Sequence, residues 1–481
     1  LKSVDFLVPN RFDYGYGLSP EIVKVAQGYR PDLIITVDNG ISSIEGVAAA
    51  QAAGIPVLVT DHHLPGAELP MAAAIVNPNQ PGCDFPSKNL AGVGVIFYVM
   101  SALRSALRDS GWFGEQGLVE PNMANYLDLV ALGTVADVVP LDENNRILVQ
   151  QGLLRIRAGR ARPGLLALLD LGGRQPTRIV ASDLGFAVGP RLNAAGRLDD
   201  MSLGIQCLLC DSSDLAREMA MELDDFNRDR KAIEGGMQEE ALASLGALSL
   251  DQNEDELPWG LCLYDPTWHQ GVIGILASRI KDRFHRPVIA FAEASDDEVK
   301  GSARSIKGLH IRDALDRVAA KHPGVLSKFG GHAMAAGMTL AKRDLEVFKQ
   351  AFDEEVRGVL SLEDLQATIL TDGELGGPDM TLELAQLLRD AGPWGQHFPE
   401  PVFEGEFYLI QQRIVGSKHL KLVVAEDSDG QQLIDAIAFN VDLDQWPNET
   451  CKQVKLAYRM DVNEFRGRQS LQFMVEHLVA L

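Results

Sequence analysis

Three adjacent residues that can bind metals or transfer protons occur at Asp61, His62 and His63. They directly follow residues 57–60, an apolar run without polar alternation, which predicts a short buried strand of a parallel sheet. In such sheets ligands bind beyond the carboxyl ends of the strands. The triplet is therefore a candidate site. For an isolated His-His pair, however, the commoner arrangement is that one histidine packs against the next helix and Asp61 caps that helix.

A further acid follows the preceding apolar run. Residues 32–38 predict a strand that ends at Asp38, and the small residues at 44–50 predict a helix before the strand at 57–60. Strand, helix and strand at this spacing indicate a βαβ unit with a right-handed crossover. Both strands are then parallel, so we expect Asp38 and His62 at the same edge of the sheet.

Asp137 is a lone acid in residues 133–140, which we interpret as an apolar loop after helices at 93–107 and 125–132. A carboxylate in apolar surroundings is costly unless a cation or hydrogen bonds compensate its charge. Two interpretations stay open from the residues alone: a metal ligand, or an acid that caps backbone N–H groups.

Two further stretches have residues suited to phosphate. Residues 189–197, with Arg191, Asn193 and Arg197 among small residues, predict a loop that a substrate backbone can approach closely. Ser302 and Arg304 are two apart on a predicted extended segment, so they can face one way and offer a hydroxyl and a guanidinium to one phosphate.

The pair Gly330-Gly331 precedes His332 at the end of a second α/β unit. Exposed backbone N–H groups at such a glycine pair suit phosphate or oxyanion contact, although a Gly-Gly pair is more often a turn.

Composition limits the class of protein. The chain has 481 residues, which is too long for a single hydrophobic core. Its formal charge of -23 argues against a wide basic nucleic-acid surface. Five cysteines, including a Cys207/Cys210 pair flanking two leucines, indicate a reducing compartment and buried thiols rather than zinc. No apolar run reaches the length of a membrane span, and we expect a soluble cytoplasmic protein.

The composition and the residue pattern of the sequence change along the chain. Heavy charge at helical spacing in residues 212–248 predicts a long connecting helix, and the acidic stretch 251–258 predicts a domain joint. After residue 365, five short strands with basic and aromatic residues predict an OB-like β-barrel that binds single strands. These residues are Lys418, His419, Lys421, Tyr458, Arg459, Phe465, Arg466 and Arg468.

The ordered set of motifs resembles the DHH phosphoesterase superfamily: Asp38 in Val-Asp-Asn-Gly, the Asp61–His63 triplet, and Asp137 in Gly-Thr-Val-Ala-Asp-Val-Val-Pro. Gly330-Gly331-His332 resembles the companion DHHA1 domain. Residues 190–197, 268–274 and the terminal barrel make the chain similar to the RecJ family of bacterial exonucleases.

The resemblance implies an α/β protein with a parallel-sheet DHH domain (1–205), a connecting helix (206–250), a DHHA1 domain (251–362) and an OB-like barrel (363–481). It implies a 5′→3′ exonuclease of single-stranded DNA that releases mononucleotides and serves DNA repair and recombination. It also implies a two-metal Mn²⁺ or Mg²⁺ site, with single-strand-binding protein and a helicase as partners.

Roles for individual residues are likewise implied by the resemblance. Asp38, His62 and Asp137 would be metal ligands, His63 would lie beside the scissile phosphate, and Asp61 would orient His62. The residues that would hold phosphates of the strand in a cleft between the two domains are Arg191, Asn193, Arg197, Ser302, Arg304, Gly330, Gly331 and His332.

One departure concerns the first motif of the family, an Asp-x-Asp that supplies further metal ligands. It does not occur before Asp38, and Asp13 has neither a strand before it nor a second acid beside it. Since the sequence also starts without Met, we interpret the chain as N-terminally truncated and expect weak or absent nuclease activity from it.

Three rival interpretations fit the sequence less well. A DHH–DHHA1 phosphodiesterase of short oligonucleotides or cyclic dinucleotides normally has no terminal barrel. A non-catalytic single-strand-binding scaffold has no need to keep Asp38, His62, His63 and Asp137. A structural histidine–metal protein needs a closed tetrahedral ligand set, whereas these residues follow separate strands.

Overall fold

The computed structural model describes residues 3–8, 17–198, 200–250, 257–416, 418–430, 432–443 and 445–481. The chain forms two compact units. Unit 1 comprises residues 1–192, 201–221 and 369–481, and unit 2 comprises residues 193–200 and 222–368. Asp13 and residues 251–256, in the predicted domain joint, lie outside the described residues.

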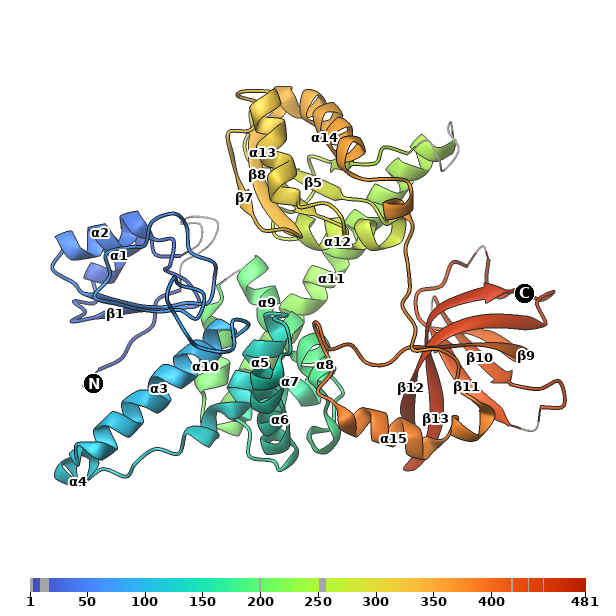
Figure 1. Cartoon of the computed structure of the whole chain (residues 1–481), viewed down its shortest axis with the longest axis horizontal. Coiled ribbons are helices and arrows are strands. Elements are labelled where there is room, and N and C mark those ends of the chain that lie inside the picture. Colours follow the sequence, from blue (N-terminus) through green and yellow to red (C-terminus); the bar gives the residue numbers. More distant parts are fainter. Residues whose placement is uncertain are drawn as a thin grey trace. The chain divides into compact units, whose positions relative to one another are not determined.

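Unit 1 begins with a small parallel sheet, drawn in blue in Figure 1. Its strands pair in the order β1-β2-β3, and Ile34 lies opposite Val57. Val57, Val59 and Val47 are fully buried, whereas Ile35 and Val37 of β1 are exposed, so the apolar faces of this sheet are only partly covered. The predicted βαβ unit is confirmed. The elements are α1 (Pro20–Gln27), β1 (Ile34–Val37), α2 (Ile44–Ala52), β2 (Val57–Thr60) and β3 (Ala74–Val76).

A group of helices follows the sheet. The α-helices are α3 (Gly92–Asp109), α4 (Trp112–Gln116), α5 (Leu127–Ala136), α6 (Glu143–Arg157), α7 (Pro163–Leu171), α8 (Ala181–Asp183), α9 (Gly189–Leu198) and α10 (Ser202–Leu209). Short 3-10 turns η1 (Met123–Tyr126) and η2 (Pro176–Arg178) and a π-helical turn η3 (Leu184–Val188) connect them.

Two loop predictions in this region are wrong. Helix α5 continues to Ala136, so Asp137 is its C-cap rather than part of a loop. Residues 189–197, predicted as a loop, lie in helix α9. The small residues between the two arginines suggested a loop, but Leu192, Ala194 and Ala195 are buried, and burial of one face stabilises the helix.

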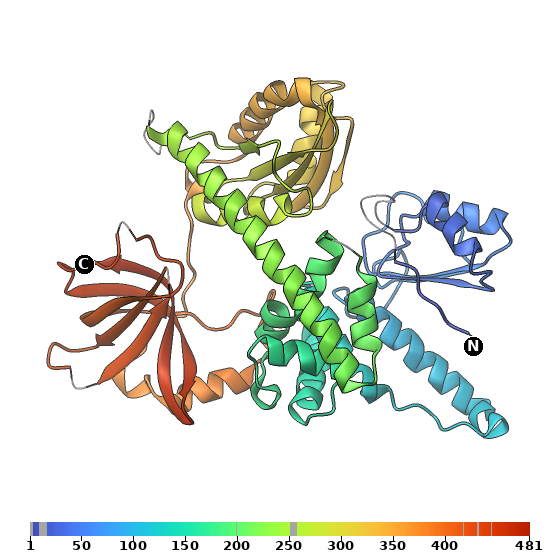
Figure 2. The same ribbon diagram turned by 180° about the vertical axis from the view of Figure 1, so that it is seen from behind.

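The long helix α11 (Ser213–Leu250) confirms the predicted connecting helix and is continuous in Figure 2. Its residues from 222 onward belong to unit 2.

The sheet of unit 2 has the order β4-β5-β6-β8-β7, with β4 and β5 parallel and the other pairs antiparallel. The elements are β4 (Leu261–Tyr264), α12 (Ile273–Phe284), β5 (Val288–Glu293), β6 (Glu298–Arg304), α13 (Ile311–Lys321), β7 (Lys328–Gly331), β8 (Ala335–Ala341), η5 (Lys342–Asp344), α14 (Leu345–Val359) and η6 (Glu363–Leu365).

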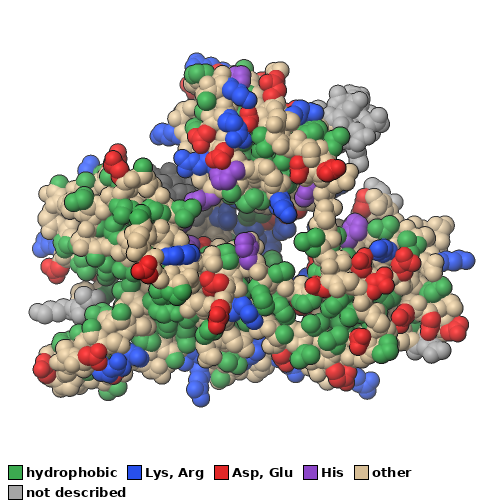
Figure 3. Space-filling view, in the orientation of Figure 1, with side chains coloured by type: hydrophobic (Ala, Val, Ile, Leu, Met, Phe, Trp, Pro, Cys, Tyr) green, Lys and Arg blue, Asp and Glu red, His purple; other side chains and the backbone are tan. Residues whose placement is uncertain are grey.

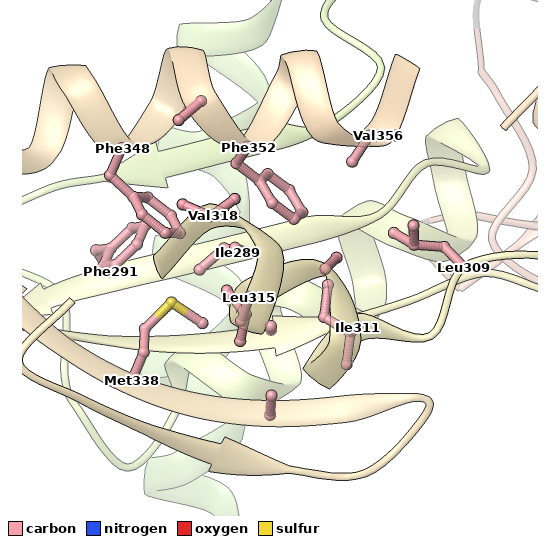
Figure 4. Close-up of a cluster of buried hydrophobic side chains, with 14 of the residues drawn as sticks. Ile289, Phe291, Leu309, Ile311, Leu315, Val318, Met338, Phe348, Phe352 and Val356 are labelled. Carbon is pink, nitrogen blue, oxygen red and sulfur yellow. The ribbon is translucent and has the colours of Figure 1, made fainter. Parts of the chain in front are cut away.

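An aromatic cluster forms the core of unit 2 between this sheet and helices α13 and α14 (Figure 4). Phe348 stacks on Phe352 with ring centroids 6.1 Å apart, and Phe291 meets Phe348 edge to face at 5.7 Å. All three are fully buried, so they fix α14 against the strand that leads toward Ser302 and Arg304.

The C-terminal part of unit 1 is a closed barrel in the order β10-β11-β13-β12-β9, which confirms the predicted OB-like architecture. Tyr458, predicted on the binding surface, is instead fully buried, stacked 3.9 Å from Phe473. The side chain of Phe465 lies outside the described residues. The elements are η7 (Gly377–Asp379), α15 (Leu382–Ala391), β9 (Phe403–Val415), β10 (His419–Ala425), β11 (Leu433–Ala438), β12 (Gln453–Phe465) and β13 (Arg468–Ala480).

Charges of both signs are distributed over the molecule. On the face shown in Figure 3, Asp and Glu side chains are interspersed with Lys and Arg. In the barrel, Lys421 pairs with Asp435 at 3.2 Å and Arg459 with Glu400 at 2.8 Å. Part of the basic charge expected for strand binding is therefore neutralised by neighbouring acids.

Within the described residues, no helix combines the length and the apolar character that a membrane crossing requires. Cys207 is fully buried, and burial raises the pKa of its thiol to about 11, which confirms the predicted buried thiol for this residue. Cys210 is only half-buried.

Candidate metal centre

Asp38 follows β1 in a strained backbone conformation. Its φ is +64°, a region that Asp tolerates better than most residues, and its N–H donates to the Thr60 carbonyl at 3.0 Å. The Thr60 hydroxyl in turn donates to the Thr36 carbonyl at 2.6 Å. These bonds join the ends of β1 and β2, so that the carboxylate of Asp38 is held beside the triplet.

Helix α3 begins against Asp38. An added Cβ at Gly92 would lie 2.5 Å from both the Cβ and the Oδ1 of Asp38, so only glycine permits this approach. The start of a helix carries partial positive charge, which favours a carboxylate there. Gly92 was not predicted from the sequence; its only signal was the run of small residues at the start of the predicted helix.

The Asp61 side chain organises the triplet. It is 1% exposed, and its Oδ1 accepts from the backbone N–H of His62 at 2.7 Å and contacts Nδ1 of His63 at 2.7 Å. Its Oδ2 accepts from the N–H of Ile41 at 2.9 Å. Asp61 thus orients the ring of His63, whereas it holds only the backbone of His62; the implied role of orienting the His62 ring is not what this geometry shows.

Asp137 reaches the same place from the end of α5. Its Oδ2 lies 3.4 Å from Nε2 of His62. The next residue, Val138, has a φ of +59°, which is rare for a β-branched residue, and it turns the chain sharply after the carboxylate. The distance to His62 favours the ligand interpretation of Asp137 over that of a simple cap.

The donor atoms around His62 that could hold a divalent cation are Oδ1 of Asp38 and Oδ2 of Asp137, together with Nε2 of His62 itself. Nε2 of His62 is buried without a hydrogen bond of good geometry, although Oδ1 of Asp38 lies 2.9 Å away. Two ligands about 2.1 Å from one octahedral ion lie about 3.0 Å apart. The 2.9 Å separation of His62 Nε2 from Asp38 matches this value, and the 3.4 Å separation from Asp137 is longer. The ligand atoms of Asp38, His62 and His63 also lie within 4.8 Å of one another. Carboxylates are donors that suit Mn²⁺ and Mg²⁺, and imidazole is a common ligand of first-row transition metals.

The pKa shifts reflect a concentration of negative charge. Burial lowers the pKa of His62, but the adjacent Asp38 and Asp137 carboxylates raise it by more, and the net shift is upward. Burial raises the pKa of Asp137. The contact with Asp61 raises the pKa of His63, so its protonated form is favoured. A cation bound among these groups would compensate their charge.

The predicted phosphate-binding residues of unit 2 partly come together. Arg304 Nη1 donates to Ser302 Oγ at 3.2 Å, which confirms that the two side chains share a face of β6. A Cβ added at Gly274 would lie 2.9 Å from both Ser302 Oγ and Arg304 Nη2, so these side chains lie over the start of α12. Arg197 donates from Nη1 to the Gly271 carbonyl at 3.1 Å, in the loop before this helix.

Other predicted residues are placed differently. Arg191 donates to the carbonyls of Ala187 and Leu171 at 2.6 and 3.2 Å, a contact that ties helices of unit 1 together. Gly330-Gly331 does not form an exposed turn: it lies in β7 and pairs with Gly337 and Ala336 of β8. His332 and Asn193 are exposed. The roles of these residues toward substrate stay predictions.

Three domain families match consecutive parts of the chain. Residues 1–134 match the DHH family, N-terminal domain; residues 260–358 match the DHHA1 domain; and residues 371–477 match the RecJ OB domain. The proteins named single-stranded-DNA-specific exonuclease RecJ from Dickeya dadantii (strain 3937) and Escherichia coli (strain K12) are each 59% identical over 477 residues, 99% of this chain and 82% of theirs. The chain belongs to the RecJ family.

Solved RecJ structures have the same fold. The crystal structure of RecJ in complex with Mn²⁺ from Thermus thermophilus matches with a TM-score of 0.77 and 28% identity, over 96% of this chain and 64% of that chain. Its counterpart with Mg²⁺ matches with a TM-score of 0.69 and 26% identity, over 95% of this chain and 65% of that chain. This chain therefore spans less than two thirds of those RecJ chains, which were solved with either ion.

Proposed function

We propose that the chain is a 5′→3′ exonuclease specific for single-stranded DNA, which releases mononucleotides by metal-assisted hydrolysis in DNA repair and recombination. The observation that carries this proposal is the convergence of Asp38 and Asp137 on Nε2 of His62, at 2.9 and 3.4 Å, in a chain of the RecJ family. The relatives are named as exonucleases of single-stranded DNA, and the RecJ OB domain matches the barrel of this chain.

Asp38, His62 and Asp137 would hold the divalent cation, Mn²⁺ or Mg²⁺ in a two-metal site. When bound, the metal polarises the scissile phosphate and activates water. Burial raises the pKa of Asp61, but the hydrogen bonds from His63 and Ile41 lower it by more, so the carboxylate stays an acceptor at pH 7. His63, with a raised pKa, would donate to a phosphate oxygen beside the metal.

Ser302 and Arg304 would bind a phosphate of the strand at the start of α12, with Arg197 close to the same loop. A guanidinium and a hydroxyl beside a helix N-terminus are a suitable combination for a phosphate, since each supplies donors to its oxygens. A terminal phosphate held there would set the polarity. Single-strand-binding protein and a helicase stay predicted partners.

The test is a single-turnover assay with the chain in excess over a 5′-labelled single strand in Mn²⁺. We expect mononucleotide release from the single strand and none from a blunt duplex, with release lost in Asp38→Asn and His62→Ala. The matched control is Asp32→Asn, an exposed acid just before the same strand, which should retain release. The rate of mononucleotide release tests the separate prediction of weak or absent activity.

Equal degradation of the duplex, or degradation that survives His62→Ala, would contradict the proposal. Selective binding of the single strand without release, in a chain that also fails to bind Mn²⁺, would replace it with the binding scaffold.

A further inference from the structure

The loop after β3 contacts the backbone of the triplet through amide side chains. Asn79 donates from Nδ2 to the carbonyl of His62 at 2.6 Å, and Asn77 donates from Nδ2 to the carbonyl of His63 at 2.9 Å. Neither residue was singled out in the sequence, where Asn77-Pro78-Asn79 is typical of an ordinary turn after a strand.

Hydrogen bonds fix the two asparagine side chains relative to each other and to the loop. Oδ1 of Asn77 accepts from the N–H of Asn79 at 2.7 Å, and Asn79 donates a second time, to the Lys88 carbonyl at 3.1 Å. Asn77 is 1% exposed, and a buried amide with its donor and acceptor both bonded is strongly oriented.

The triplet needs such support because it lies at the end of its strand. The Asp61 N–H still donates to Val76 of β3, at 3.1 Å, which continues the β2–β3 pairing. Beyond it, the N–H groups of His62 and His63 bond to the Asp61 carboxylate, and their carbonyls bond to the asparagines. Side chains therefore replace the β ladder on both sides of the two peptide groups.

We propose that Asn79 and Asn77 are positioning residues of the metal centre: by holding the His62 and His63 carbonyls they set the place of the His62 Nε2 atom between Asp38 and Asp137. This rests on the proposed function, since it assumes that His62 binds the metal. A neutral amide suits the task, because it supplies a donor to each carbonyl without adding charge to a site that already has three carboxylates.

A purely structural role is the alternative, and the same loop offers a matched control. Gln80 donates from Nε2 to the Ile75 carbonyl at 3.0 Å. This is also a side-chain amide bonded to a backbone carbonyl, but the carbonyl belongs to β3 rather than to the triplet. Loss of Gln80 therefore removes an equivalent loop contact without touching His62.

The experiment is calorimetric titration of the chain with Mn²⁺, together with its thermal unfolding midpoint. Asn79→Ala should weaken Mn²⁺ binding about tenfold, the scale at which ligand-orienting contacts act. Gln80→Ala should bind Mn²⁺ like the unsubstituted chain, and its unfolding midpoint should change by a similar amount to that of Asn79→Ala. Asn77→Ala, a more buried substitution, should weaken binding in the same direction, and its midpoint shows whether it remains folded.

Unchanged Mn²⁺ affinity in a folded Asn79→Ala variant, or equal losses in Asn79→Ala and Gln80→Ala, would overturn the inference. Titration of His62→Ala separates this from failure of the proposed function. If the unsubstituted chain does not bind Mn²⁺, or if His62→Ala binds it equally well, the metal centre itself is wrong.

Discussion

At the scale of single residues, the candidate site depends on positions whose backbone conformation or close contacts few other residues would tolerate. Asp38 and Val138 both have a positive φ, at +64° and +59°, and they lie at or beside two of the proposed ligands. Strained backbone of this kind persists only where the surroundings impose it. For Asp38 these surroundings include Thr60 and Gly92, which constrain its backbone and its side chain, respectively.

Gly92→Ala tests that constraint. The added Cβ would lie 2.5 Å from Asp38 Oδ1, so the carboxylate or the start of α3 must move. We expect Mn²⁺ affinity to fall about tenfold or more by calorimetry. Gly114→Ala in α4 is the control, since nothing lies within 4 Å of its added Cβ. A Gly92→Ala variant with full affinity would show that α3 does not constrain the site.

At the scale of elements, unit 2 contains a buried carboxylate whose ion pairs join two helices. Glu355 of α14 is only 4% exposed and pairs with Lys321 of α13 at 2.7 Å and with Arg317. Burial raises the pKa of Glu355, but the bonds from Lys321 and Arg317 lower it more, so the net shift is downward. Its ionised form therefore stabilises the packing of α13 on α14.

Glu355→Gln should destabilise the chain by about 1 kcal/mol at pH 7, because the carboxylate loses its ion pairs, and solvent screens the half-exposed Arg317 and exposed Lys321. A depressed folded-state pKa contributes stability above the unfolded value of about 4.3, and this contribution is lost as the pH falls through the folded pKa. The difference between the variant and the unsubstituted chain should therefore shrink below about pH 4.

Urea denaturation between about pH 3 and pH 7 measures this difference. Glu354→Gln, exposed and adjacent on the same helix, is the control and should follow the unsubstituted chain throughout. A Glu355→Gln penalty that is constant with pH would exclude the ionised carboxylate as its cause.

At the scale of the whole molecule, a formal charge of -23 must coexist with binding of a polyanion. Charges that are a Debye length or more apart are largely screened at physiological salt, so local groups decide the contact. The group of Ser302, Arg304 and Arg197 in unit 2 is such a local arrangement. Divalent cations at Asp38, His62 and Asp137 would compensate negative charge in unit 1.

Arg304→Gln should reduce the salt dependence of single-strand binding. Each phosphate contact contributes about 0.7 to the slope of log affinity against log salt, so the slope should become shallower by about 0.7. Fluorescence anisotropy in metal-free buffer at several salt concentrations measures it. Arg343→Gln is the control, because that side chain is 87% exposed. An unchanged slope in Arg304→Gln would mean that Arg304 does not contact a phosphate.

Local pattern alone predicted much of this protein. Apolar runs ending in polar residues located β1, β2 and their carboxyl edge, and alternation of apolar and polar residues located the barrel strands. Both patterns are visible in short segments because the burial of each residue in a strand follows from its position along that strand. Helix α9 and the burial of Tyr458 were predicted wrongly, since each depends on which distant segment packs against it, whereas Gly330-Gly331 pairs with the next strand along the chain.

The sequence by itself therefore determined the types and order of the metal-centre residues, from Asp38 through the Asp61–His63 triplet to Asp137. Only the tertiary structure decided that Asp137 ends α5 beside His62, that Gly92 lets α3 approach Asp38, and that Asn77 and Asn79 hold the triplet. The physical reason is that these are through-space contacts between residues far apart in the chain, and a local pattern of residues contains no record of them.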